Sequence, residues 1–170
     1  MKGLILAGLL LLNIVIQAMI FQSIPILGTQ PDTLLCLVAS LGFTNGYFTA
    51  AATGMFGGLM FDILFGWPVG ANALLYLLTG VLAGMARERL RVENLLYACG
   101  FTVGISLIKE LLGFLVALIA GVSFPLLRAL LLGALPTALL TGIIMLPIHV
   151  PLKRLAQCSI MRRRYQEMLD

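Results

Sequence analysis

The sequence predicts an all-α integral membrane protein, a bundle of six transmembrane helices, on three observations. The 170 residues are 61% hydrophobic and 11% charged, with a mean hydropathy of +1.07. Soluble domains carry about 25% charged residues, so this chain has too little polar surface to fold in water. Apolar runs alternate with short segments rich in Gly and Pro, and basic residues gather in every second segment. Both patterns are typical of a chain that crosses a bilayer repeatedly.

The apolar runs define the predicted helices, because a helix needs about 20 apolar residues to cross the hydrocarbon core. We place the transmembrane domain at residues 1–151 and a basic cytoplasmic tail at 152–170. The start has one lysine and a long apolar run, which indicates a retained first helix rather than a cleaved signal peptide. The six expected helices span residues 3–23, 32–44, 46–64, 71–86, 94–119 and 126–150.

Glycine, proline and charged residues mark the ends of these helices. The segment SIPILGTQPD ends the first helix. The apolar stretch 32–64 is too long for one crossing, so the turn residues in GFTNGY divide it into a short helix and a longer one. A merged helix, giving five in total, is the alternative. FGWPVG ends the third helix, RERLRVE the fourth, and Gly121 with Pro125 the fifth, while Pro136 predicts a kink in the sixth.

The basic residues give the expected orientation. With the N-terminus inside, the inner segments hold nine of the eleven Lys and Arg, and the outer loops 24–31, 65–70 and 120–125 hold none. This is a strong positive-inside bias, so both termini are expected in the cytoplasm. The tail would also attract anionic lipid headgroups. Besides Lys2, the expected cytoplasmic anchors are Arg87, Arg89, Arg91, Lys153, Arg154, Arg162, Arg163 and Arg164.

Three successive helices carry a pair of glycines at the GxxxG spacing, which puts both on one face and lets two helix backbones approach closely. The pairs are Gly54 with Gly58, Gly80 with Gly84, and Gly100 with Gly104. The first two pairs are candidates for a helix-packing or partner interface, and ordinary packing inside the bundle is the simpler interpretation. Asn72 and Tyr76 share the glycine face of the fourth helix.

Five charged residues are expected at a similar depth in the outer part of the membrane. Charges in lipid are costly, so they normally pair or face a cavity. We therefore expect an outer-leaflet polar cluster; the alternative is that each side chain extends separately to the interface. Asp62 at the end of the third helix is expected to orient the following turn, by capping Asn72 or the next helix's amides. The five residues are Asp32, Asp62, Lys109, Glu110 and Arg128.

No catalytic, metal or cofactor site is predicted. The single histidine, His149, lies at the inner boundary and is interpreted as an interfacial residue rather than a proton relay. The three cysteines are widely spaced and have no histidine beside them, so they indicate neither a metal site nor a disulfide framework. Walker A and HExxH motifs are absent from the sequence. The basic tail lacks a folded surface for reading nucleic acid, so proteins and membrane lipids are the expected partners.

Residues 31–90 contain several weak motifs in a definite order. A Pro-Asp pair opens the second helix, a G-x-x-x-D sequence closes the glycine-rich third, and a Gly/Pro turn leads to Gly-x-Asn-Ala at the fourth. These are Pro31-Asp32, Gly58 with Asp62, Pro68, and Gly70-x-Asn72-Ala73. In this order and spacing the stretch resembles the rod shape-determining protein MreD family. The rest of the chain resembles the family in length and hydropathy.

The resemblance implies a non-enzymatic subunit of the bacterial cell-elongation machinery, in the cytoplasmic (inner) membrane. Proteins of this family bind MreC, which has one membrane helix. Together they link MreB filaments to the glycosyltransferase RodA and its penicillin-binding transpeptidase, and so support peptidoglycan synthesis in lateral wall growth. MreC is thus the expected direct partner, through its membrane helix, and the other three are indirect partners.

The same resemblance suggests an alternative function. MreD-like proteins are similar in fold to the S-components of energy-coupling-factor transporters, which have six helices and bind vitamins. A vitamin-binding membrane subunit is therefore the second hypothesis. It requires an outward pocket and long outer loops, whereas the predicted outer loops are short. An independent pore is disfavoured because no helix has a continuous polar face.

Overall fold

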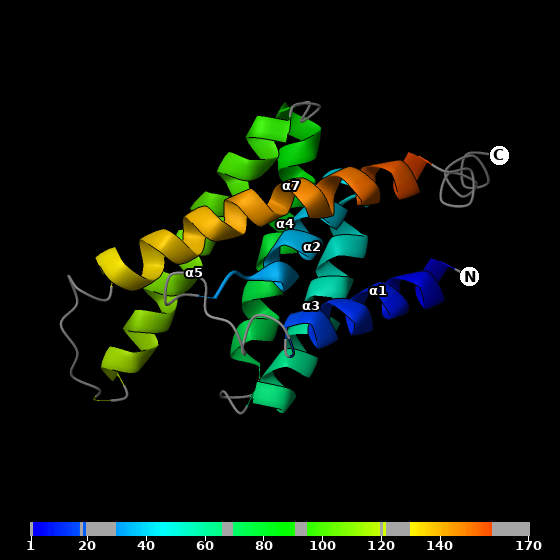
Figure 1. Ribbon diagram of the computed structural model, residues 1–170. Coiled ribbons are helices and arrows are strands. Elements are labelled where there is room, and N and C mark those ends of the chain that lie inside the picture. The colour runs from blue at the N-terminus through cyan, green and yellow to red at the C-terminus, as the bar shows by residue number, and fades with distance from the viewer. Residues whose placement is uncertain are drawn as a thin grey trace.

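The computed structural model describes residues 2–17, 19, 30–65, 70–90, 95–119, 121 and 130–157. These residues form six α-helices and the π-helical turn η2, and residues 17 and 19 after the first helix are π-helical as well (Figure 1). The all-helical fold and the count of six helices rather than five are thereby confirmed. The elements are α1 (Lys2–Ile16), α2 (Thr33–Asn45), α3 (Tyr47–Phe65), α4 (Ala71–Leu90), α5 (Leu95–Ile119), η2 (Leu130–Ala134) and α7 (Leu135–Gln157).

Three helices within the described ranges are long and apolar enough to cross a membrane, over Tyr47–Leu64, Leu96–Leu115 and Leu135–Lys153. The other three contain shorter apolar stretches, at Leu6–Ile16, Thr33–Asn45 and Ala71–Arg87. The chain is a membrane protein in which long and short helices are combined.

The short helix α2 lies at the centre of the molecule, with α7 on one side and α3 and α4 on the other (Figure 1). Its residues 33–43 are all buried, so every face of the helix contacts another element. At 1.5 Å per residue, its 13 residues extend about 20 Å, less than the hydrocarbon thickness of about 30 Å. Its start must therefore be satisfied by protein groups, because it lies inside the bundle rather than in water.

Glycine 46 separates α2 from α3. Its φ angle of 91° lies in the left-handed region, which glycine adopts without a steric penalty, and its backbone N–H still donates to the Gly42 carbonyl. The next residue, Tyr47, begins α3. The turn therefore falls within the GFTNGY segment and lets the chain reverse into a longer helix.

The glycine pairs of α3 and α4 lie at the contact between these two helices. A Cβ added to Gly80 would lie 2.5 Å from the Ala50 carbonyl carbon. Added Cβ atoms would also overlap Tyr76 at Gly54, Ala73 at Gly58 and Tyr47 at Gly84, in each case at the backbone. By contrast, Gly100 and Gly104 on α5 have no atom of the described chain within 4 Å of an added Cβ.

The last helix differs most from its predicted course. The π-helical turn η2 ends at Ala134, two residues before Pro136, where a kink was expected, and α7 then continues beyond the expected end at residue 150 to Gln157. It does so through Pro147 and Pro151, although each proline removes a backbone hydrogen bond. Tertiary packing offsets this cost, because Leu152 is buried in the same core cluster as the leucines of α2.

Candidate functional site: a polar network at the start of the buried helix

Asp32 caps the buried end of α2. Its carboxylate Oδ1 accepts a hydrogen bond from the Leu35 backbone N–H at 2.9 Å, the usual capping interaction of aspartate. Its own backbone N–H donates to Thr141 Oγ1 of α7 at 3.1 Å. Asp32 is 5% exposed, so its charge needs a partner inside the protein.

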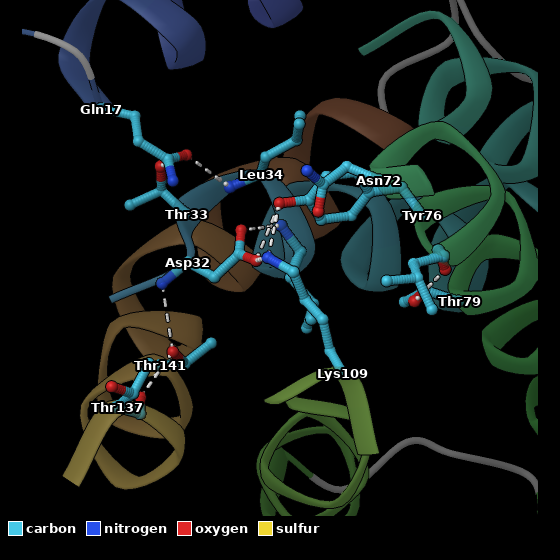
Figure 2. Close-up of polar contacts among 12 residues, drawn as sticks. Gln17, Asp32, Thr33, Leu34, Asn72, Tyr76, Thr79, Lys109, Thr137 and Thr141 are labelled. Carbon is cyan, nitrogen blue, oxygen red and sulfur yellow. Dashed lines mark hydrogen bonds and ion pairs between the residues drawn. The ribbon is translucent and has the colours of Figure 1, made fainter. Parts of the chain in front are cut away.

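That partner is Lys109 of α5, whose ammonium forms an ion pair with Asp32 Oδ2. Tyr76 of α4 donates its hydroxyl to the same oxygen at 2.8 Å and accepts from Lys109 Nζ at 2.9 Å. Lys109 Nζ also lies 4.8 Å from the centre of the Tyr76 ring, within cation–π range. Figure 2 shows the lysine extending from α5 to the start of α2, with Asp32 between Tyr76 and Thr141. We call Asp32, Tyr76 and Lys109 the charged triad.

Asn13 of α1 and Gln17, the residue just after α1, complete the network with uncharged groups. Gln17 Oε1 accepts from the Leu34 backbone N–H at 3.2 Å and from the Thr33 hydroxyl at 2.9 Å. Asn13 Nδ2 donates to the Thr33 carbonyl at 3.3 Å. The first amides of α2, which have no partner within the helix, are thus shared between Asp32 and α1.

The expected polar cluster is brought together only in part. Asp32 and Lys109 pair directly, and Glu110 lies half-buried beside Lys109 without a hydrogen bond to the triad. Asp62 binds a separate set of groups, and Arg128 lies outside the described residues. The two carboxylates nevertheless contact successive turns of α4, Asp62 through Asn72 and Asp32 through Tyr76.

Asp62 fixes the corner between α3 and α4. It accepts hydrogen bonds from the Gly70 backbone N–H at 2.8 Å, from Asn72 Nδ2 at 2.8 Å and from the Ala73 backbone N–H at 3.3 Å. It is 1% exposed, and its negative charge lies at the positive end of α4. The prediction that Asp62 caps the following helix is confirmed by these contacts.

A second polar contact near the other end of α2 was not predicted. His149 Nδ1 lies 2.8 Å from Ser40 Oγ, and its ring packs edge-on against Phe43 at a centroid distance of 6.2 Å. His149 is 6% exposed, so its side chain is packed within the bundle, and its position at the inner membrane boundary stays a prediction. Because α7 continues past residue 150, this residue lies inside the bundle rather than at its edge.

Sequence reasoning also missed Thr141, Asn13 and Gln17 as members of the network. Tyr76 had a signal, because it shares a face with Asn72 and the α4 glycines. Thr141 had none, since a hydroxyl in an apolar helix commonly bonds to its own backbone. Thr141 does so too, donating to the Thr137 carbonyl at 2.7 Å while accepting from Asp32.

The basic residues expected at the inner surface are described only in part. Arg87 near the end of α4 and Lys153 in the last turns of α7 are exposed. For Arg89 and Arg154 the structure describes the helical backbone alone. Arg91, Arg162, Arg163 and Arg164 lie outside the described ranges.

The buried polar atoms of the network are all hydrogen-bonded. Among the described residues, every buried side-chain nitrogen or oxygen has a hydrogen-bond partner within the chain. The same residues contain no group of three His, Cys, Asp or Glu side chains that could hold a metal ion. The arrangement connects α1, α4, α5 and α7 to the start of α2, and its evident effect is to hold helices together.

The fold and this network define a class: a helical membrane protein whose interior polar groups bind one another across helices. Residues 1–159 match the family model of the rod shape-determining protein MreD, and the chain belongs to this family. The resemblance seen in residues 31–90 is confirmed over most of the chain. Membership gives the protein a role in rod-shape determination and an association with the shape-determining complex. No curated protein and no solved structure matches the chain.

Proposed function

We propose that this protein is a non-enzymatic scaffold of the cell-elongation complex, a multi-pass protein of the inner membrane with both termini in the cytoplasm. In this proposal it binds an MreC-type protein through that partner's membrane helix. The bound pair then supports peptidoglycan synthesis in lateral wall growth, with MreB, RodA and a penicillin-binding transpeptidase as indirect partners. The family match supports the cellular role, and the charge bias of the sequence supports the orientation.

The observation that carries the scaffold proposal is the satisfied polar interior. A binding site for a small polar molecule needs convergent groups that are free to contact it. Here the groups that converge on Asp32 already bond to each other, including the lysine and the tyrosine. A vitamin-binding function like that of the S-components would require this network to open, so the structure favours the scaffold over that alternative.

The space beside the glycines of α3 and α4 is occupied by the backbone of the facing helix. These glycine surfaces therefore have no room for a partner's helix. Loss of complex formation in a Gly58→Leu variant would then reflect misfolding of the bundle. Leucine at Gly104 has open space instead, and it alters only the outer surface of α5. Comparing the two variants separates folding defects from binding defects.

Co-purification with an MreC-type partner tests the proposal. The tagged chain and the partner are expressed together, extracted in mild detergent and separated by size-exclusion chromatography. We expect a stable complex with the parent chain and with a Cys99→Ser control, and no folded protein for Gly58→Leu. A parent chain that elutes without the partner would contradict the scaffold proposal. A complex that still forms when the partner lacks its membrane helix would contradict binding through that helix.

The same preparation tests the alternative function. Denaturing the purified chain and analysing the released small molecules by mass spectrometry should yield detergent and lipid only. A vitamin released in amounts equal to the protein would overturn the scaffold proposal in favour of a transport subunit.

A further inference from the structure

Among the described side chains of α5, the buried ones precede residue 109, and several leucines after it are exposed. The buried side chains before that point are Ala98, Thr102, Ile105 and Ser106. After it, four large apolar side chains are exposed, namely Leu111, Leu112, Leu115 and Leu118. Among the hydrogen bonds of the described residues, Lys109 is the outermost α5 side chain that reaches the start of α2 and α4.

The neighbours of α5 explain this asymmetry. Its close contact is with α7, where a Cβ on Gly142 would overlap Val103. Towards α4 it has little direct packing, and in Figure 1 the end of α4 and the start of α5 lie close together while the two helices separate toward their other ends. The side chain of Lys109 bridges this separation, because it reaches Asp32 of α2 and Tyr76 of α4.

An ion pair between helices differs from apolar packing in the effect of substituting one of its residues. In lipid, apolar contacts between helices have little hydrophobic driving force, so interhelical polar contacts carry much of the specificity. Removing either charge leaves its partner buried and unpaired, which is far more costly than replacing both by neutral groups. Among the described contacts, the connection of the outer part of α5 to the start of α2 and to α4 therefore depends on this ion pair and on the Tyr76 hydrogen bond.

We propose that the charged triad is a latch that fixes the outer half of α5, residues 110–119, relative to α2 and α4. With the ion pair formed, α5 is held at the angle seen here. With the pair broken, α5 keeps its contact with α7 near Val103, and its outer half moves away from α4. The protein then has two arrangements of one helix, and the ion pair sets the balance between them.

Distances between spin labels on α4 and α5 test the latch in the isolated chain, so the result does not depend on any partner. Labels are attached to cysteines at Leu74 and Leu115, which are exposed, in a chain whose three native cysteines are replaced by serine. We expect one narrow distance distribution for the parent chain in lipid nanodiscs. A reference pair at Ile63 and Leu78, on α3 and α4, reports on the rest of the bundle.

The informative variant is the double change Asp32→Asn with Lys109→Met. Asparagine keeps the capping interaction of α2, and no charge is left unpaired, so we expect a thermal midpoint close to the parent's. If the latch holds α5, the Leu74–Leu115 distribution becomes broader and shifts to longer distances, while the Ile63–Leu78 distribution is unchanged. An unchanged Leu74–Leu115 distribution in this folded variant would overturn the proposal.

Two further variants separate position from stability. Lys109→Met alone should lower the thermal midpoint as well as broaden the distribution, because it leaves the Asp32 charge buried and unpaired. Glu110→Gln is the matched control, since it removes the neighbouring charge from the same turn without touching the triad. A broadened distribution in Glu110→Gln equal to that of the double variant would show that charge on α5, rather than this ion pair, positions the helix.

Discussion

Asp32 and Asp62 are both buried carboxylates that accept hydrogen bonds from the start of a helix, α2 for Asp32 and α4 for Asp62. Their negative charges are stabilised by different groups. Asp32 has an ammonium group as its partner, in addition to the first amides of α2. Asp62 is stabilised by two backbone N–H groups and one amide side chain at the start of α4. Hydrogen bonds accepted by a carboxylate are charge-assisted and stronger than those between two neutral groups. Asp32 therefore connects the start of α2 to α4, α5 and α7, whereas Asp62 fixes the turn between α3 and α4.

At the corner between α3 and α4, Asp62→Ala is expected to lower the free energy of unfolding by about 2–3 kcal/mol, because it leaves the first amides of α4 unpaired. Asn72→Ala removes one of the same hydrogen bonds and should cost about 1 kcal/mol. Unfolding in mixed micelles of increasing SDS fraction measures both values. Equal losses for the two variants would show that the backbone contacts of Asp62 contribute nothing.

The Ser40–His149 contact is expected to contribute about 1 kcal/mol to stability, the usual net value of a buried hydrogen bond. Ser40→Ala leaves the histidine nitrogen without its partner, whereas Ser40→Ala with His149→Phe removes both polar groups and keeps the edge-on ring contact with Phe43. We expect the double variant to be less destabilised than the sum of the two single changes. Strict additivity across this cycle would mean that the two side chains do not interact.

Among the elements, α3 and α4 form the tightest pair, and their glycines explain why. The two backbones meet where Gly54 and Gly58 face α4 and where Gly80 and Gly84 face α3. Such close approach favours van der Waals contact between helices in lipid. Helix α5 has the same sequence spacing at Gly100 and Gly104 but no facing helix in the described chain. The GxxxG spacing therefore shows where two helices could approach closely, and the tertiary fold determines whether another helix packs there.

The same substitution should have opposite effects on these two helices. Gly58→Ala introduces a Cβ that overlaps the Ala73 backbone, so we expect a loss of about 1–3 kcal/mol. Gly104→Ala fills open space and raises helix propensity, so stability should stay the same or rise by up to about 1 kcal/mol. Thermal unfolding of the purified variants in one detergent compares them. A Gly104→Ala variant as unstable as Gly58→Ala would contradict this assignment of the two surfaces.

For the whole molecule, the described helices surround α2, so the shortest apolar helix is also the most buried. This arrangement agrees with the rule that apolar helices of 10–14 residues are commonly core helices. The ends of such a helix lie within the bundle, and both ends of α2 are met by polar groups from α7. Thr141 contacts the first end and His149 lies near the second.

The proposed orientation makes a prediction about access to the two membrane faces. In a chain without native cysteines, a cysteine at position 2 or 168 should react with an impermeant maleimide only after the inner membrane is opened. A cysteine at position 123 should react in intact spheroplasts. This pattern follows from the concentration of Lys and Arg in the inner segments. Labelling of both ends of the chain from outside would reverse the assigned orientation.

Much of the fold was predictable from the sequence, and much less of the site. Apolar runs located the helices because in lipid each helix must satisfy its own backbone, which is a local requirement. Asp62 was predictable for the same reason, as its partners lie only eight to eleven residues away. The extension of α7 through two prolines was not predictable, because burial of Leu152 against α2 offsets a local penalty.

The sequence by itself determined the membrane class, the six helices, the family motifs of residues 31–90 and the capped corner at Asp62. Only the tertiary structure decided which polar residues meet. The partners of Asp32 are 44, 77 and 109 residues away in the chain, at Tyr76, Lys109 and Thr141. Helical periodicity shows which side of a helix is polar, but it carries no information about the helix that side will face. That choice is made by packing, when the bundle closes around α2 and each buried polar group must find a partner.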